Sequence, residues 1–201
     1  MSESRKEEIV WATLELAADK GLGSVSMQQI ADKVGITKAS LYNHFSSRDE
    51  IVEAMYDLIR KKSKEKASII DVDYDMLTSK GSMKDVLNTA VNSYKSIVND
   101  PQMYLFYKII ISERPISRVA SEIMVRETRT MIEATKALFR SLQERGKADF
   151  QNVDTAALSF AMAIHSIMDH EIDLDHSGIG SNSDLMGDYI DEFCRIYSSR
   201  K

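Results

Sequence analysis

The chain has 201 residues, enough for one or two domains with a substantial buried core. Only two prolines and eight glycines interrupt it, so its composition favours a mostly helical protein. The single cysteine, Cys194, excludes an internal disulfide framework and is typical of a reducing compartment. No apolar run approaches the ~18 residues of a membrane helix, and residues 1–8 lack the character of a signal peptide. We therefore expect a cytoplasmic protein with no membrane partner.

The net charge of −5 is unevenly distributed along the chain. Residues 1–66 contain 11 lysines and arginines and 11 aspartates and glutamates, whereas residues 67–201 contain 15 and 20. A neutral N-terminal part can still bind nucleic acid through a localised patch, while the distal part is acidic. The basic run 60–66 is best explained as the solvated end of a helix, where cations interact favourably with the helix dipole. A direct contact with DNA is the alternative.

Two short helices joined by a tight turn are predicted within residues 26–45. Ser26 and Gln29 have the spacing of a capping box, in which each side chain bonds to the backbone N–H of the other residue. Gly35 supplies the positive φ that ends the first helix, and Thr37 is a good N-cap for the second. One face of the first helix is apolar and consists of Met27, Ile30, Ala31 and Val34.

The second helix is predicted over Lys38–Phe45, with a small and polar outer face. At ~100° per residue, Leu41 and Phe45 face inward. The outward positions are Ala39, Ser40 and Asn43, with Tyr42 and His44 on the two flanks. Such a face suits the major groove of DNA, where Asn can bond adenine, Ser is adaptable and an Ala methyl can touch thymine.

Longer helices are predicted on both sides of this pair. The preceding helix ends near Gly21, and Ser47–Glu50 has the pattern of a second capping box at the start of the following one. The first turn of that following helix can meet a phosphate. The apolar and small residues of the preceding helix are Ile9, Val10, Ala12, Leu14, Leu16 and Ala17.

The order of residues over 30–51, IADKVGITKASLYNHFSSRDEI, resembles the tetracycline-repressor (TetR) family of bacterial transcription regulators. The resemblance covers about residues 5–55 and departs from the family at Ala17, where Phe is frequent, and at Ala39, where Gly is common. It implies an all-α protein of about nine helices, with a three-helix DNA-binding domain followed by a larger ligand-binding and dimerisation domain. We assign residues 1–48 to the first domain, the helix 49–66 to the connection, and residues 67–201 to the second domain.

The resemblance implies a homodimeric repressor that leaves a pseudo-palindromic double-stranded operator when a small organic effector binds. Together with the predicted helix angles, it places Lys38, Ser40 and Asn43 at base edges. Phosphate contacts are expected from Tyr42, His44 and Arg48. The predicted DNA-binding set is Ser26, Thr37, Lys38, Ala39, Ser40, Tyr42, Asn43, His44 and Arg48.

The distal part has weaker signals. The helical pattern falters over 71–75, and 79–81 has the character of a loop. Ser82 with Asp85 predicts a helix to about Asn99, and Pro101 begins another. The segment 116–145 is one long helix or two.

Two C-terminal segments, 153–172 and 185–197, are apolar over more than one face, which requires two packing partners. In the resembled family the last two helices form a four-helix bundle with a second subunit, and a large core within one chain is the alternative. The predicted dimer contacts are Phe160, Ile164, Met168, Tyr189, Phe193 and Ile196.

Methionines and aromatic residues are frequent beyond residue 66, and the resemblance implies a small-molecule pocket among the helices of 82–172. Methionine also packs ordinary cores well, so a plain core is the alternative for any single one. The candidate ligand-binding residues are Tyr94, Tyr104, Tyr107, Arg118, Met162 and His165.

One cluster has the composition of a metal site. His165, Asp169 and Asp173 follow at i, i+4 and i+8, with His170 and His176 nearby, so a metal-sensing regulator of the same fold is an alternative. A polar helix end explains this spacing more simply, and a helical enzyme using His165, Asp169 and His170 is a more distant alternative. No phosphate loop or nucleophile elbow occurs, so we expect neither catalysis nor a cofactor. Cys194 fits buried packing better than a redox sensor.

Overall fold

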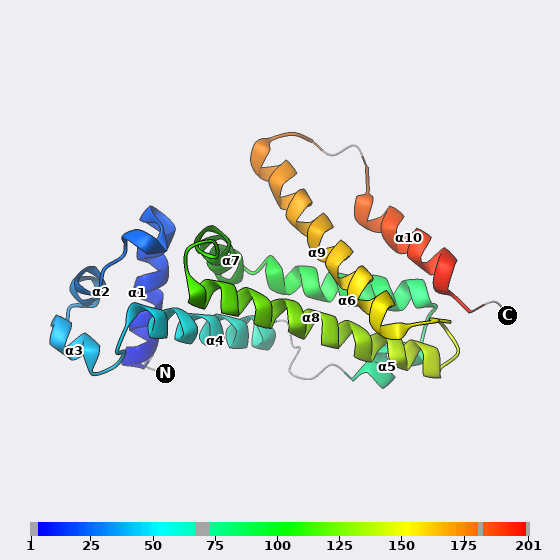
Figure 1. The fold of residues 1–201 in the computed structure, drawn as a ribbon, viewed down its shortest axis with the longest axis horizontal. Helices are drawn as coiled ribbons and strands as arrows, with labels where there is room; N and C mark the ends of the chain where they lie inside the picture. Colours follow the sequence, from blue (N-terminus) through cyan, green and yellow to red (C-terminus); the bar gives the residue numbers. More distant parts are fainter. Residues whose placement is uncertain (1–3, 67–72, 181–182, 200–201) are drawn as a thin grey trace. The chain divides into compact units, whose positions relative to one another are not determined.

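The computed structural model describes residues 4–66, 73–180 and 183–199, and these residues form ten α-helices, one short 3-10 helix and a single isolated β-bridge (Figure 1). The all-α fold expected from the sequence is therefore confirmed. The first elements are α1 (Arg5–Lys20), the 3-10 turn η1 (Leu22–Ser24), α2 (Met27–Val34), α3 (Lys38–Tyr42) and α4 (Arg48–Lys66). The later ones are α5 (Tyr74–Ser79), α6 (Met83–Val98), α7 (Pro101–Glu113), α8 (Arg118–Glu144), α9 (Val153–Ser177) and α10 (Leu185–Tyr197). No helix among the described residues is long and apolar enough to span a membrane.

The chain packs as two units, which are described separately. The first consists of residues 1–70 and 96–127, and the second of residues 71–95 and 128–201. Helix α7 and the first turns of α8 thus belong to the unit that contains the predicted DNA-binding helices. The roles expected for 1–48 and 67–201 stay predictions, because packing units and functional domains need not share their boundaries.

The core of the first unit is formed by the inner faces of α1, α2, α3, α4 and α7. Ile9, Ile30, Leu41 and Ile59 are completely buried in it. Each of these helices buries one apolar side, which is how short amphipathic helices gain stability that they lack alone.

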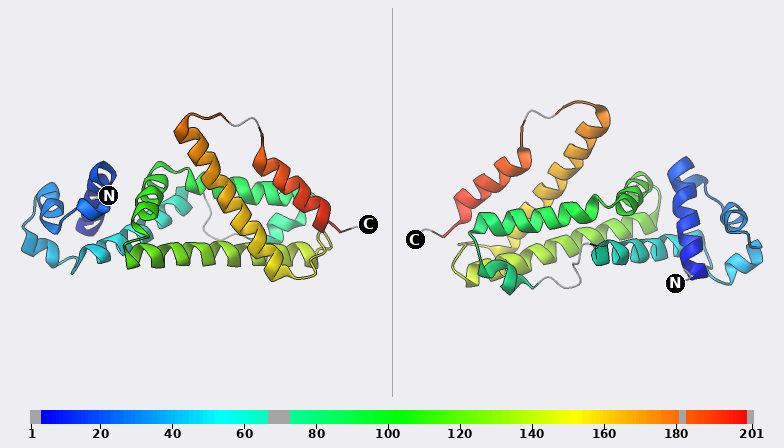
Figure 2. Two further views of the ribbon diagram at one scale, coloured as in Figure 1. Left: turned by 45° about the horizontal axis from the view of Figure 1, so that its top comes forward. Right: turned by 180° about the vertical axis from the view of Figure 1, so that it is seen from behind.

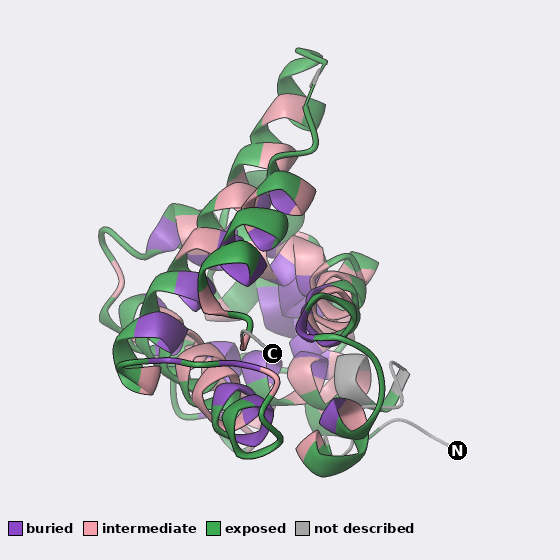
Figure 3. Cartoon of the chain, turned by 90° about the vertical axis from the view of Figure 1, so that its right-hand side faces the viewer, coloured by how far each residue is buried: buried purple, intermediate pink, exposed green. Residues whose placement is uncertain are grey.

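The second unit has an aromatic core between α8, α9 and α10. The Phe139 and Phe150 rings stack at a centroid distance of 4.6 Å, and the Phe160 and Phe193 rings lie 4.8 Å apart. Helices α9 and α10 lie side by side in every view, with their buried residues on one side of each helix (Figures 2 and 3). An antiparallel bridge between Ala148 and Ser198 joins the chain after α10 to the segment before α9.

Two elements, α5 and α9, differ from the sequence prediction, and a third, α8, settles an alternative that the sequence left open. Helix α5 forms where no helix was expected, because Asp73 accepts the Met76 N–H at 2.9 Å and the buried Thr78 hydroxyl bonds to Ser141. The segment after Pro115 is one helix, α8, which contains neither glycine nor proline. Helix α9 continues past residue 172 to Ser177 despite its acidic last turns, and its last turns are mostly exposed (Figure 3).

Candidate nucleic-acid interface

Both predicted caps of the two short helices are present. The Ser26 hydroxyl accepts the Gln29 N–H at 3.3 Å, and the Gln29 side chain accepts the Ser26 N–H at 2.9 Å. Gly35 has φ 73°, the left-handed conformation that closes α2. The Thr37 hydroxyl accepts the N–H of Ser40 at 3.1 Å and begins α3. These caps satisfy N–H groups that a short helix would otherwise leave unbonded.

Helix α3 ends earlier than the sequence indicates. It covers Lys38–Tyr42, and Asn43 and His44 form a turn after it rather than continuing to Phe45 as predicted. The His44 and Phe45 N–H groups both bond to the Leu41 carbonyl, at 2.9 and 3.0 Å. This turn still buries Leu41 and Phe45, as expected.

The opposite side of α3 presents side chains that the fold does not use. Lys38, Ala39, Tyr42 and Asn43 are exposed, whereas Ser40 and His44 are half-buried. In the part of the chain that the structure describes, the side chains of Lys38, Tyr42, Asn43 and His44 have no hydrogen bond or ion pair. An aromatic ring, an amide, an imidazole and an ammonium group are thus available on one short segment.

Polar groups at the start of α4 form hydrogen bonds with one another. The Ser47 hydroxyl accepts the Glu50 N–H at 3.2 Å, but the Glu50 carboxylate accepts from the N–H and hydroxyl of Ser46 rather than from Ser47. The Ser46 N–H, followed by the Ser46 hydroxyl, lowers the pKa of Glu50, and Lys6 lowers it further. The Glu50 carboxylate therefore accepts hydrogen bonds at the start of α4, where the sequence predicts that a phosphate can bind.

Arg48 was predicted to contact a phosphate, and in the structure its guanidinium is turned toward the backbone. Nη1 donates to the carbonyls of Leu22, Gly23 and Val25 at 3.0, 3.3 and 3.5 Å. Its side chain is half-buried there. No feature of the local sequence indicates these carbonyl partners, because they lie more than twenty residues away along the chain.

The six candidate ligand-binding residues are divided between the two units. Tyr104, Tyr107 and Arg118 belong to the first, and Tyr94, Met162 and His165 to the second. The three tyrosines are half-buried, but the Arg118 side chain is 90% exposed and pairs with Glu122 at 2.8 Å. Arg118 is therefore a surface residue in this structure.

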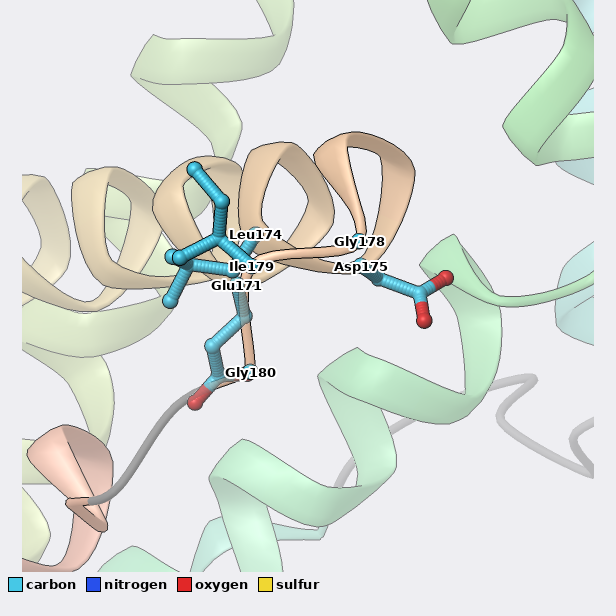
Figure 4. A pocket seen from close by; sticks show the side chains of 6 residues that line it. All are labelled: Glu171, Leu174, Asp175, Gly178, Ile179 and Gly180. Atoms are coloured by element: carbon cyan, nitrogen blue, oxygen red, sulfur yellow. The ribbon is translucent and has the colours of Figure 1, made fainter.

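A cavity of about 340 Å³ lies at the C-terminal end of α9. Leu174 and Ile179 lie side by side in it, whereas the Asp175 carboxylate points away from them (Figure 4). Its wall also includes Glu171, which pairs with Lys95 of α6 at 2.8 Å. None of the six candidate ligand-binding residues lines it.

Four of the six candidate dimer residues are buried within their own chain: Phe160, Ile164, Met168 and Phe193. Tyr189 is half-buried against Phe160, so these helices bury much of their apolar surface without a second subunit. Ile196, in contrast, is 57% exposed. Other exposed apolar residues on the two helices are Leu158, Met162 and Leu185.

The structure does not bring the potential metal ligands around His165 together into a metal site. His165 Nε2 lies 3.8 Å from the Asp169 carboxylate, and no group of three or more potential ligands is arranged to hold a metal ion within the described ranges. The metal-sensing alternative therefore gains no support. Cys194 is buried, and burial raises the pKa of its thiol to about 11, which disfavours the reactive thiolate.

Comparison with known proteins identifies a family for the N-terminal part of the chain. Residues 9–55 match the model described as bacterial regulatory proteins, tetR family. The transcriptional repressor KstR2 of Mycolicibacterium smegmatis is 40% identical over 50 residues, which are 25% of this chain and 24% of that protein. The matched part is thus about a quarter of the relative's length.

Solved structures extend the likeness of the fold to nearly the whole chain. The flavonoid-responsive regulator FrrA has a TM-score of 0.73 at 16% identity and covers 98% of both chains. The SmeT–triclosan complex has a TM-score of 0.71 at 13% identity, covering 97% of this chain and 92% of the other. The capped helix pair at the N-terminus thus lies in a domain of the tetR family of bacterial regulatory proteins, and the chain as a whole has the fold of these solved structures.

Proposed function

We propose that the chain is a ligand-responsive DNA-binding regulator that acts as a homodimer, and that it represses until a small organic effector releases it from its operator. The observation that carries this proposal is the outer side of α3 and of the turn after it, where four polar or aromatic side chains have no partner within the described residues. A buried inner side fixed by Leu41 holds them in place. Solvent-exposed groups presented by a rigid, capped helix are well suited to a groove of DNA.

The chemistry of each side chain suggests its role. The Asn43 amide can bond an adenine edge, and Lys38 and Ser40 can reach neighbouring bases. The Tyr42 hydroxyl and the His44 imidazole, at the flanks, are suited to phosphate oxygens. Ser26 and Thr37 contribute by capping α2 and α3, so that the N-termini of these helices face the DNA. The Ala39 methyl group can contact a base.

The test compares Tyr42→Phe with Asn43→Ala on a duplex selected from a random library by the wild-type protein. Tyr42→Phe removes one phosphate contact, so it should weaken binding to all sequences alike. Asn43→Ala should relax the preference at one base pair, with a loss of ~1–3 kcal/mol in discrimination, and leave binding to other sequences nearly unchanged. Asp57→Asn, an exposed change elsewhere in the first unit, is the control. Unchanged binding by both α3 variants would show that another surface reads the DNA.

The homodimer is proposed to use the exposed apolar residues of α9 and α10. Ile196 is kept from the predicted set, and Leu158 and Met162 replace its buried members, because a residue covered by its own chain has little surface left for a partner. Ile196→Glu should shift the protein to the monomer in sedimentation while leaving the helical content unchanged, since it puts an unpaired charge in an apolar contact. A wild-type monomer at micromolar concentration would contradict this proposal and the paired half-sites.

The effector is proposed to be an organic molecule with a large apolar surface. FrrA is described as flavonoid-responsive and SmeT was solved with triclosan, and both share this fold. In the second unit, the half-buried Tyr94 and His165 are candidates for the few polar contacts of such a site, and the exposed Met162 is the weaker candidate there. In the first unit the candidates are the half-buried Tyr104 and Tyr107, and the exposed Arg118 is the weakest of the six. Release from DNA requires an affinity difference between two states, typically ~1–3 kcal/mol of coupling.

A thermal-shift screen tests the effector class. A bound compound at ~100 times its dissociation constant should add ~2.7 kcal/mol of stability. A large shift with a divalent metal that is lost in His165→Ala, with none from lipophilic compounds, would favour the metal sensor instead. The proposal further assigns the protein no catalysis and a cytoplasmic location.

A further inference from the structure

A buried carboxylate of α7 holds a turn that lies directly before the helix-turn-helix pair. Glu113, the last residue of α7, is only 7% exposed, and its Oε1 accepts the N–H of Gly23 at 3.0 Å. Gly23 lies in the turn η1, ninety positions earlier in the chain. Both residues belong to the first packing unit.

The same turn is held from a second helix. Nη1 of Arg48, at the start of α4, donates to the carbonyls of Leu22 and Gly23 at 3.0 and 3.3 Å and to that of Val25 at 3.5 Å. Glu113 therefore accepts the turn's N–H while Arg48 donates to its carbonyls. The two side chains thus hold one short backbone segment by both its N–H and its carbonyl groups.

The turn matters because α2 begins directly after it. Leu22 and Val25 are buried, but apolar contacts alone are non-directional and leave the backbone some freedom to rotate. Hydrogen bonds to charged groups are directional and roughly twice as strong as neutral ones. Ser26, the N-cap of α2, immediately follows Val25, and α2 packs against α3, so the orientation of this turn is passed to the helix that presents Asn43.

A buried glutamate at position 113 is not the residue that would stabilise the fold most. Its neighbours on the buried side of α7, Met103, Phe106 and Ile110, are all apolar. An apolar side chain at the same position would avoid the desolvation of a carboxylate, and replacing buried charges in this way is often neutral or stabilising. The gain from Glu113 is therefore in geometry rather than in stability.

We propose that Glu113 and Arg48 are positioning residues for DNA reading, acting through the turn Leu22–Val25 and not by touching DNA. The inference rests on the proposed function. It differs from the sequence-based role of Arg48 as a phosphate contact, and it gives a residue outside the predicted DNA-binding domain a share in sequence discrimination.

The test uses Glu113→Met, which keeps the size of the side chain and removes the acceptor, and Glu113→Gln, which keeps an acceptor without the charge. The probes are a duplex selected from a random library by the wild-type protein and a scrambled version of it. Glu113→Met should unfold at the same or a higher denaturant concentration, yet lose about tenfold in affinity for the selected duplex, with little change on the scrambled one. Glu113→Gln should stay within about twofold of the wild type, because its amide oxygen can accept the Gly23 N–H.

Arg48→Ala separates positioning from phosphate contact. A positioning role predicts weaker binding to the selected duplex with an unchanged dependence on salt, whereas a phosphate contact would weaken both duplexes and lower the salt slope by ~1. Thr78→Val is the matched control, since it removes a buried hydrogen bond from the second unit.

The outcomes are distinguishable. Failure of the wild-type protein to select any duplex would overturn the proposed function itself. If selection succeeds, the inference is overturned when folded Glu113→Met discriminates like the wild type, when Thr78→Val loses as much discrimination, or when Glu113→Gln is as weak as Glu113→Met. A reduced salt slope in Arg48→Ala would show instead that Arg48 contacts a phosphate.

Discussion

Helices α3 and α10 use their two sides differently. Helix α3 depends on Leu41, with Phe45 just after it, for its attachment to the core, and its outer polar side chains have no partners within the described residues. Helix α10 buries Phe193 in an aromatic cluster with Phe139 and Phe160, and its outer side combines the ion pair of Arg195 and Glu192 with exposed Ile196. The residues available for recognition are therefore those that the fold does not need.

The largest expected effect tests this division within α10. Phe193→Ala should destabilise the protein by about 3–5 kcal/mol, because it leaves a cavity among the five aromatic rings that surround Phe193. Ile196→Ala, three residues on, should change the unfolding free energy of the monomer by less than about 0.5 kcal/mol. Urea unfolding of both variants at low protein concentration measures the difference, and comparable losses would mean that Ile196 is also part of the core.

The next prediction concerns the Tyr56 hydroxyl, a polar group that is hydrogen-bonded within the fold. The Tyr56 hydroxyl donates to Glu127, which also pairs with Arg60, and Arg126 lies over the Tyr56 ring at 4.3 Å. Burial, followed by the hydrogen bond to Glu127, raises the pKa of Tyr56 to about 12. The unfolded chain releases this proton near pH 10, so the stabilisation is complete below pH 10 and is lost as the pH rises toward 12.

Tyr56→Phe should therefore lower the unfolding free energy by about 1–2 kcal/mol at pH 8 and flatten its fall between pH 10 and 12. Chemical denaturation at several pH values provides the measurement, with Tyr42→Phe as the control, since the Tyr42 hydroxyl has no described partner. Equal pH dependence in Tyr56→Phe and the wild type would exclude this coupling.

The sequence was informative where the physics is local. Ser26 with Gln29, Gly35 and Thr37 were identified correctly because a cap and its helix are neighbours in the chain. The bond between Glu113 and Gly23 spans ninety positions, so no local pattern indicates its partner. The only available signal was an acidic residue on the apolar stripe of α7, which marks Glu113 as unusual without saying what it binds.

Periodicity was less informative for the long C-terminal helices. It identifies apolar sides of α9 and α10, but the same stripe suits a core or a partner, and Phe193 and Ile196 both lie on it. Their separation into buried and exposed needed the packing of α8. Helix α5 was missed for a related reason, since the hydrogen bond between Thr78 and Ser141 is a tertiary contact.

A smaller effect is expected from the cap of α3. Thr37→Ala removes the hydroxyl that accepts the Ser40 N–H, and such a change costs about 1 kcal/mol. A helix of five residues has few other bonds to retain its shape, so binding to a selected duplex should weaken together with stability. Thr37→Ser keeps the acceptor and should restore both. If Thr37→Ser behaves like Thr37→Ala in denaturation and DNA titration, the hydroxyl is not the relevant group.

The smallest effect concerns the charge at the start of α4. The Glu50 carboxylate accepts from the Ser46 N–H and hydroxyl, which a DNA phosphate could otherwise approach, and these bonds lower its pKa. Glu50→Gln keeps an acceptor for Ser46 and removes a negative charge close to α3, so affinity for both specific and scrambled duplexes should rise, on the order of twofold to threefold at low salt. Asp57→Asn makes the same change in charge two turns further along α4, and should raise affinity less. Equal gains in the two variants would assign the effect to net charge, and a loss in Glu50→Gln would mean that the carboxylate is needed to hold the turn after α3.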